Sequence, residues 1–102
     1  PRFTRTGNDL RCQQSVDLLT AVLGGKTQVP TLHGEKLMTV QAGTQYGATL
    51  RMRGLGMPIY DHSDTFGDLY VEILIHIPRE LTAEEHALFT KLAELKQPSN
   101  SA

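Results

Sequence analysis

The sequence has one cysteine, no tryptophan and no long apolar run. The single cysteine, Cys12, excludes an internal disulfide and any zinc site built from cysteines. No apolar stretch approaches the ~20 residues that a membrane-spanning helix needs, so we expect no membrane association. The net charge of -1 gives no overall basic field that would attract nucleic acid or anionic lipid.

The length of 102 residues is enough for one domain with a single modest core. The chain opens at Pro1 on Arg-Phe-Thr-Arg, without a methionine. We therefore expect a piece of a longer protein, and a processed small protein is the alternative.

The longest run of strand formers is the segment Asp68–Pro78, and we expect it to lie inside a sheet. Its apolar residues recur with the two-residue period of a strand, and Pro78 ends it because proline cannot donate to a ladder. One face is mixed, with Tyr70 and Leu74 beside charged or polar neighbours. The other face is wholly aliphatic and consists of Leu69, Val71, Ile73, Ile75 and Ile77.

The residues before this strand predict further strands and one short helix. Asp17 can cap a helix over Leu18–Leu23, which Gly24-Gly25 then ends. Pro30 favours an edge position for its strand. The turns between strands are short, so antiparallel pairing is expected. The expected strands are Leu10–Val16, Lys26–Leu32, Glu35–Val40 after a hairpin turn at His33-Gly34, and Ala48–Arg53.

A second helix is expected over Leu81–Leu95. It begins with a capping box in which Thr82 and Glu85 satisfy each other's backbone amides. Its apolar stripe, Leu88, Phe89, Leu92 and Leu95, can dock on the chain's own sheet or meet another chain, and the spacing alone slightly favours docking. We therefore divide the chain into a β-domain at 1–80, a helix at 81–96 and a disordered tail at 97–102.

A search for catalytic or metal-binding sets finds little. No two histidines share metal-ligand spacing, and His62 beside Asp61 and Asp64 is more simply a solvated acidic loop. Cys12 alternates on a strand face and is more simply a core residue than a nucleophile. Gly54-Leu55-Gly56 is not followed by a helix that could cradle phosphate. We expect a binding or structural module with no catalytic residues, metal or cofactor.

Basic residues could in principle merge into a nucleic-acid site, although a solvated strand face is the simpler interpretation. Three phenylalanines and three tyrosines are too few to build stacking platforms for single strands. The basic residues in question are Arg2, Arg5, Arg11, Lys26, Arg51 and Arg53.

Six short motifs, taken together and in order, resemble the second C-terminal β-domain of DnaJ-type (J-domain) co-chaperones. The resemblance covers the chain from Phe3 to about Leu95. The motifs are Phe3-x-Arg5-x-Gly7-Asn8-Asp9-Leu10, Ala21-Val22-Leu23-Gly24-Gly25, Val29-Pro30-Thr31-Leu32-x-Gly34, Ala42-Gly43-Thr44, Leu50-Arg51-Met52-Arg53-Gly54-x-Gly56-Met57-Pro58 and Gly67-Asp68-Leu69.

The resemblance implies a mainly β fold: a small two-layer antiparallel β-sandwich with one short helix and a C-terminal amphipathic helix. It implies a cytoplasmic homodimer in which the C-terminal helices of two protomers pair. It further implies that unfolded client polypeptide is delivered to a DnaK-type ATPase chaperone through parts outside this chain, such as the J domain. The dimer-interface residues would be Leu81, Leu88, Phe89, Leu92 and Leu95.

The resemblance also implies weak client binding along the first strands, because the main client groove of the family lies in a preceding sister domain. A hydrophobic peptide could still add along a strand edge. Some DnaJ relatives bind curved DNA, so nucleic-acid binding is the alternative. The matching peptide-binding positions are Cys12, Gln14, Thr27, Val29, Thr31 and Tyr70, of which Gln14, Thr27 and Thr31 are polar.

Overall fold

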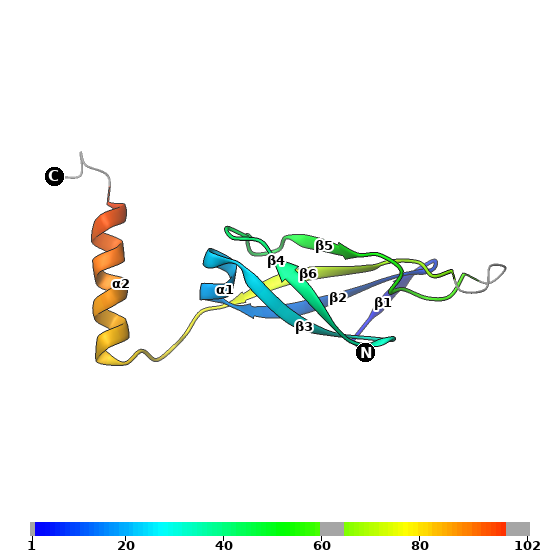
Figure 1. Ribbon diagram of the computed structural model, residues 1–102, viewed down its shortest axis with the longest axis horizontal. Coiled ribbons are helices and arrows are strands. Elements are labelled where there is room, and N and C mark those ends of the chain that lie inside the picture. The colour runs from blue at the N-terminus through cyan, green and yellow to red at the C-terminus, as the bar shows by residue number, and fades with distance from the viewer. Residues whose placement is uncertain (1, 60–64, 98–102) are drawn as a thin grey trace.

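The computed structural model describes residues 2–59 and 65–97, and it shows two β layers with one helix at their end and a second helix standing apart (Figure 1). A four-stranded sheet has the order β1-β2-β6-β5, and a two-stranded sheet is formed by β3 and β4. The elements are β1 (Thr4–Thr6), β2 (Asp9–Asp17), α1 (Leu18–Leu23), β3 (Gly25–Thr31), β4 (Gly34–Val40), β5 (Thr49–Met52), β6 (Leu69–His76) and α2 (Ala83–Lys96).

Strand β6 is an interior strand of the larger sheet, as the sequence predicts. It lies between β2 and β5. On its aliphatic face Leu69, Val71 and Ile73 have no solvent exposure, whereas Ile77 beyond its end is exposed. The core between the two layers is completed by residues of β2, α1 and the β3–β4 hairpin, namely Leu10, Cys12, Val16, Ala21, Val29, Met38 and Val40.

The pairing of β2 with β6 is parallel, in register from Leu10 with Leu69 to Asp17 with His76. The expectation of antiparallel pairing is therefore wrong for this pair, although β1–β2, β3–β4 and β5–β6 are antiparallel. Strands β2 and β6 are separated in the chain by a helix, a hairpin and β5. A connection of that length can return the chain to the end from which β2 started, as a parallel pair requires.

Strand β1 was not predicted by sequence. It is three residues long, pairs with β2 from Thr4–Arg11 to Thr6–Asp9, and is exposed along its length. Its residues carry no apolar alternation, so the periodicity that reveals a half-buried strand is missing. A short exposed strand of this kind is formed by its backbone pairing alone.

Helix α1 and the hairpin have the predicted extents to within a residue or two. The Asp17 carboxylate accepts a hydrogen bond from the Leu19 amide at 2.9 Å, and Gly24 ends the helix with φ of 87°. A Cβ at Gly24 would lie 3.1 Å from the Ala42 backbone nitrogen, so this close approach and the positive φ both favour glycine there. The hairpin loop is Leu32–His33, one residue earlier than expected, and Pro30 lies in a two-stranded sheet, where both strands are edges.

Helix α2 has the predicted capping box: the Glu85 amide donates to Thr82 Oγ1 at 3.1 Å and the Thr82 amide donates to the Glu85 carboxylate at 2.8 Å. None of its residues is buried, and it stands apart from the sheets at the end of an extended linker (Figure 1). The radius of gyration is 18.2 Å, against about 13 Å for a compact chain of this length. Docking of this helix on its own sheet, which the spacing favours, is therefore wrong.

Two sequence predictions fall on residues outside the described ranges. The acidic loop with Asp61, His62 and Asp64 is one, and the tail predicted at 97–102 is the other, apart from Gln97, which caps α2. Within residues 2–59 and 65–97, neither helix is long and apolar enough to cross a bilayer.

Candidate functional site

Three of the sequence motifs meet at one end of the larger sheet, in a cluster of backbone hydrogen bonds that we call the glycine junction (Asn8–Asp9, Gly54–Met57 and Gly67–Asp68). The Met57 amide donates to the Asn8 carbonyl at 2.8 Å, and the Gly56 amide donates to the Gly67 carbonyl at 2.9 Å. The Gly67 amide donates in turn to the Met57 carbonyl at 2.8 Å. These bonds join segments that are far apart in the chain and fix the start of β6 beside the start of β2.

The glycine junction is so tight that two of its glycines leave no room for a side chain. A Cβ at Gly56 would lie 2.6 Å from the Asn8 carbonyl oxygen and 2.7 Å from that of Asp68. A Cβ at Gly67 would collide with the Asn8 carbonyl group and lie 2.8 Å from Asp9 Oδ1. Gly56 and Gly67 therefore serve close backbone packing.

Asp68 holds the junction together with its carboxylate. One oxygen accepts from the Gly54 amide at 2.9 Å, and the other accepts from Arg51 Nε at 2.7 Å. A second Arg51 nitrogen approaches the same oxygen at 2.6 Å, and the Asp68 side chain is only 16% exposed. The hydrogen bond from Gly54, followed by that from Arg51, lowers the pKa of Asp68, because both stabilise its charged form.

We expect Asp68→Asn to remove a pH-dependent part of the stability. Because the folded pKa of Asp68 lies below its ordinary value of about 3.9, this contribution is complete above that value and is lost as the pH falls through the folded pKa. Urea unfolding of both proteins from about pH 6 down to about pH 2 measures it. The difference between their midpoints should shrink with acidification, and a difference that is independent of pH would contradict the assignment.

His33, which the sequence places only in a hairpin turn, ties the β3–β4 hairpin to the glycine junction. Its Nε2 lies 3.0 Å from the Gly56 carbonyl oxygen. Its ring also stacks edge-on against Phe66, with centroids 4.7 Å apart. Sequence reasoning missed this role because the two partners are 23 residues or more away along the chain.

The six candidate peptide-binding positions do not form one surface. Cys12 and Val29 are buried in the core. Gln14 and Thr27 are brought together, with Gln14 Nε2 3.4 Å from Thr27 Oγ1. The Thr31 hydroxyl donates within the hairpin, to the Gly34 carbonyl at 2.7 Å. Tyr70 points to the opposite face of the sheet, where its ring lies 5.4 Å from the Arg11 guanidinium carbon.

Cys12 is a core residue, as the simpler of its two interpretations predicts. It is 5% exposed, and burial raises the pKa of its thiol, against a smaller opposing effect of Arg2. A thiol held protonated in apolar surroundings is a poor nucleophile. Among the residues that the structure describes, no group of three or more histidine, cysteine or carboxylate side chains could hold a metal ion.

Two of the basic residues lie near each other on one face of the larger sheet. Arg11 of β2 and Arg51 of β5 both pair in register with Tyr70 of β6, so they lie two strands apart on the same face. Arg51 is also paired with Asp68, which offsets its charge. The other predicted basic residues are spread over the edges and the second sheet: Arg2 and Arg5 on or beside β1, Arg53 after β5, and Lys26 on β3.

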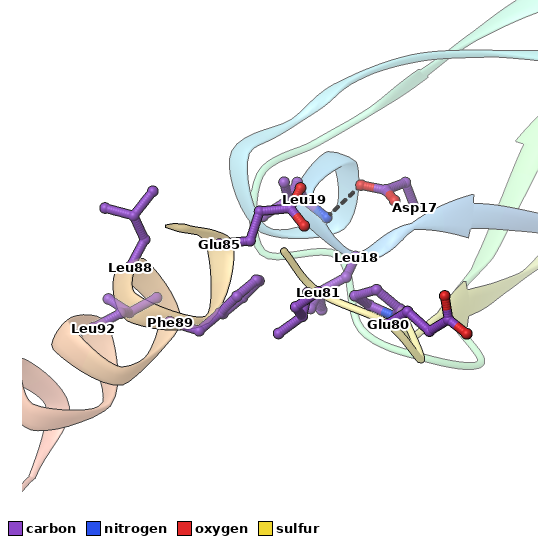
Figure 2. Close-up of a pocket in the computed structure, with 10 residues that line it drawn as sticks. Asp17, Leu18, Leu19, Glu80, Leu81, Glu85, Leu88, Phe89 and Leu92 are labelled. Atoms are coloured by element: carbon purple, nitrogen blue, oxygen red, sulfur yellow. Dashed lines mark hydrogen bonds between the residues drawn. The ribbon is translucent and has the colours of Figure 1, made fainter. Parts of the chain in front are cut away.

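An open apolar cleft lies where the linker leaves the β-domain, and Figure 2 shows its lining. Leu18 and Leu19 of α1 form one side, and Phe89 of α2 points toward Leu81 of the linker from the other. Phe89 is half-buried, whereas the four leucines predicted for the dimer interface are between 37% and 73% exposed. These leucines are Leu81, Leu88, Leu92 and Leu95.

Comparison with known proteins gives the family. The family model described as "DnaJ C terminal domain" matches residues 1–78. The chain is 40% identical over 94 residues to a "Chaperone protein DnaJ" of Azorhizobium caulinodans, covering 91% of this chain and 24% of that protein. It is 39% identical over 100 residues to one of Bartonella henselae (97% and 26%) and 45% identical over 86 residues to one of Burkholderia mallei (84% and 23%).

The chain thus spans about a quarter of the length of these relatives. The matched residues 1–78 contain the whole glycine junction and every strand described above. The chain therefore belongs to the DnaJ C-terminal domain family, and so to the DnaJ chaperones, which are not enzymes.

Proposed function

We propose that this chain is the dimerising C-terminal part of a cytoplasmic DnaJ-type co-chaperone. The observation that supports dimerisation is the exposed apolar stripe of α2 beside the open cleft. Leu88, Leu92 and Leu95 are all at least half exposed. Fully burying one leucine side chain stabilises by about 1.5–3 kcal/mol, so covering three of them favours association.

A second copy of the chain is the occupant that this surface fits. The cleft has leucines on both sides, with those of α1 facing the linker and the first turns of α2, and three carboxylates, Asp17, Glu80 and Glu85, also line it. The α2 helix of a partner would bring an identical row of leucines. A two-fold interface buries the same apolar patch on both copies, so no such patch stays exposed for further association. The affinity does not follow from the area, because ordering the linker opposes binding.

The second part of the proposal is that the domain binds unfolded polypeptide weakly and, in its parent protein, helps to present it to a DnaK-type ATPase chaperone. The family membership supports this role. Two copies of a weak site in one dimer raise the effective concentration of the second site once the first is occupied. Weak single sites are therefore sufficient for useful binding of a long client.

The test of dimerisation is the solution mass of the chain over a concentration series, beside a version that ends at Arg79. We expect the full chain to be a dimer at high concentration and the shortened chain to be a monomer at every concentration. The shortened chain should keep its fold, since α2 contributes no buried residue. A far-ultraviolet circular dichroism spectrum that retains its β signal checks this.

A pair of point variants distinguishes pairing through the stripe from a general effect of the helix. Leu92→Asp places a charge in the stripe, whereas Lys91→Asp places the same residue one position away, outside the stripe. We expect only Leu92→Asp to dissociate the dimer. A full chain that remains monomeric up to millimolar concentration, or equal effects of the two variants, would contradict dimerisation through this stripe.

A further inference from the structure

A second groove, which we call the edge groove, lies between β4 and β5. Its lining runs consecutively along both strands, over Leu37–Thr39 and Leu50–Arg53. Successive residues of a strand point to opposite faces, so a groove lined by consecutive residues borders the edge of each strand. The groove is separate from the candidate positions Gln14 and Thr27, which meet where β3 lies against β2.

Both strands that border the edge groove lack a neighbour on that side in the described chain. Strand β5 is the last strand of its sheet, and β4 pairs only with β3. In an antiparallel ladder, alternate residues direct their backbone groups away from the existing partner. An unpaired edge of this kind is a template for another extended chain.

The floor of the edge groove is apolar and adaptable. Met38 is buried, and Leu50, Met52 and Leu55 are partly buried against the core. Leu37 stands at the lip with 61% of its surface exposed. Methionine side chains fill irregular gaps, so this floor can accept apolar side chains of different shapes.

The rim of the edge groove carries positive charge. Arg51 and Arg53 both line it, and Arg53 is exposed. Arg51 is partly neutralised by Asp68, so Arg53 gives the rim its net charge. The lining contains no aromatic residue on which a base could stack, so the groove fits a peptide with acidic side chains better than a nucleic acid.

We propose that the edge groove binds an extended polypeptide segment in which apolar and acidic residues alternate, by addition of that segment as a strand along β5. The two-residue period of a strand places its apolar side chains on the floor beside Leu50 and Met52, and its acidic side chains at the rim beside Arg53. This inference rests on the proposed polypeptide binding. It assigns that binding to the edge groove and to segments in which apolar and acidic side chains alternate.

The probe is a fluorescently labelled heptapeptide of alternating leucine and glutamate, titrated with the full chain and followed by fluorescence anisotropy. Arg53→Glu should raise the Kd about tenfold, because it replaces attraction at the rim by repulsion. Leu37→Asp should raise it by a similar factor. Lys26→Glu is the matched charge reversal on β3, outside the groove, and should leave the Kd unchanged.

Two modified peptides test the mode of binding. The heptapeptide methylated on every backbone nitrogen can donate to a strand edge from neither of its own edges, and it should lose binding to the unaltered chain. The version with lysine in place of glutamate should bind more weakly to the unaltered chain and more tightly to Arg53→Glu. Arg53 and Leu37 are both exposed, so we expect the protein to keep its fold when either of them is replaced.

The remaining outcomes separate this inference from the proposed function. Binding that survives Arg53→Glu and Leu37→Asp but is lost on Thr27→Glu would overturn the edge groove and leave polypeptide binding in place. Absence of binding to any peptide would overturn both. Two further results would overturn the edge-groove proposal. If Leu37→Asp lowered the solution mass, the occupant of the groove would be a second copy of the chain. If the chain retained a DNA duplex and Arg53→Glu abolished that retention, the occupant would be nucleic acid.

Discussion

Gly67→Ala is expected to destabilise the domain severely. The added Cβ would collide with the Asn8 carbonyl group, and it would lie 2.8 Å from Asp9 Oδ1. The colliding atoms belong to backbone that is fixed by hydrogen bonds to Met57 and Gly56, so no side-chain rotation relieves the clash. We expect a loss of about 4 kcal/mol or more, a large part of the ~5–15 kcal/mol that stabilises a small domain.

The control for this experiment is Gly7→Ala, one residue from the same junction. Gly7 has φ of 61°, and a Cβ there would have nothing within 4 Å. Its replacement therefore carries only the conformational cost of a positive φ, about 1–2 kcal/mol. Urea unfolding followed by circular dichroism measures both variants. Equal losses would show that the junction tolerates a side chain at Gly67 and would contradict the close-packing role of this glycine.

Ile73→Ala is the second change with a large expected effect. Ile73 has no solvent exposure and lies on the aliphatic face of β6, in the core shared with the hairpin. Truncating a buried isoleucine removes its burial and leaves a cavity, which costs about 2–5 kcal/mol. We expect a value in the upper half of this range, seen as a lower urea midpoint with an unchanged slope.

The matched control for Ile73→Ala is Ile77→Ala, in the same segment of the chain. Ile77 continues the same alternation but is 61% exposed, because it follows the end of β6 where the chain leaves the sheet. Ile77→Ala should cost less than about 0.5 kcal/mol, as substitutions outside the core do. If Ile77→Ala proved as costly as Ile73→Ala, the linker would have to be packed in solution rather than extended.

The parts of the fold that follow from neighbouring residues could be predicted from the sequence. The alternation of β6, the Asp17 cap of α1 and the Thr82–Glu85 capping box each depend on residues within a few positions of one another. Periodicity and capping report such local structure directly. The six motifs identified the family because they occur together and in order.

The parts that depend on distant partners could not be predicted. The parallel pairing of β2 with β6 and the role of His33 both join segments that no local pattern connects. The candidate peptide positions came from a resemblance, which could not show that Cys12 and Val29 are buried in the core. The stripe of α2 was visible in the sequence, but spacing cannot tell a docked helix from one that stands free.

The parallel pair has a consequence for biosynthesis. The Asp68 amide donates to the Asp9 carboxylate although the two residues are 59 positions apart. Strand β2 therefore meets β6 only after most of the domain has been made. At about 5–20 residues per second, the nascent chain leaves the β6 side of β2 unpaired for several seconds. During that time the backbone groups along this side, from Leu10 to Asp17, have no strand to bond to. While it is being translated, the domain therefore presents an unpaired strand edge, which is a template for another extended chain.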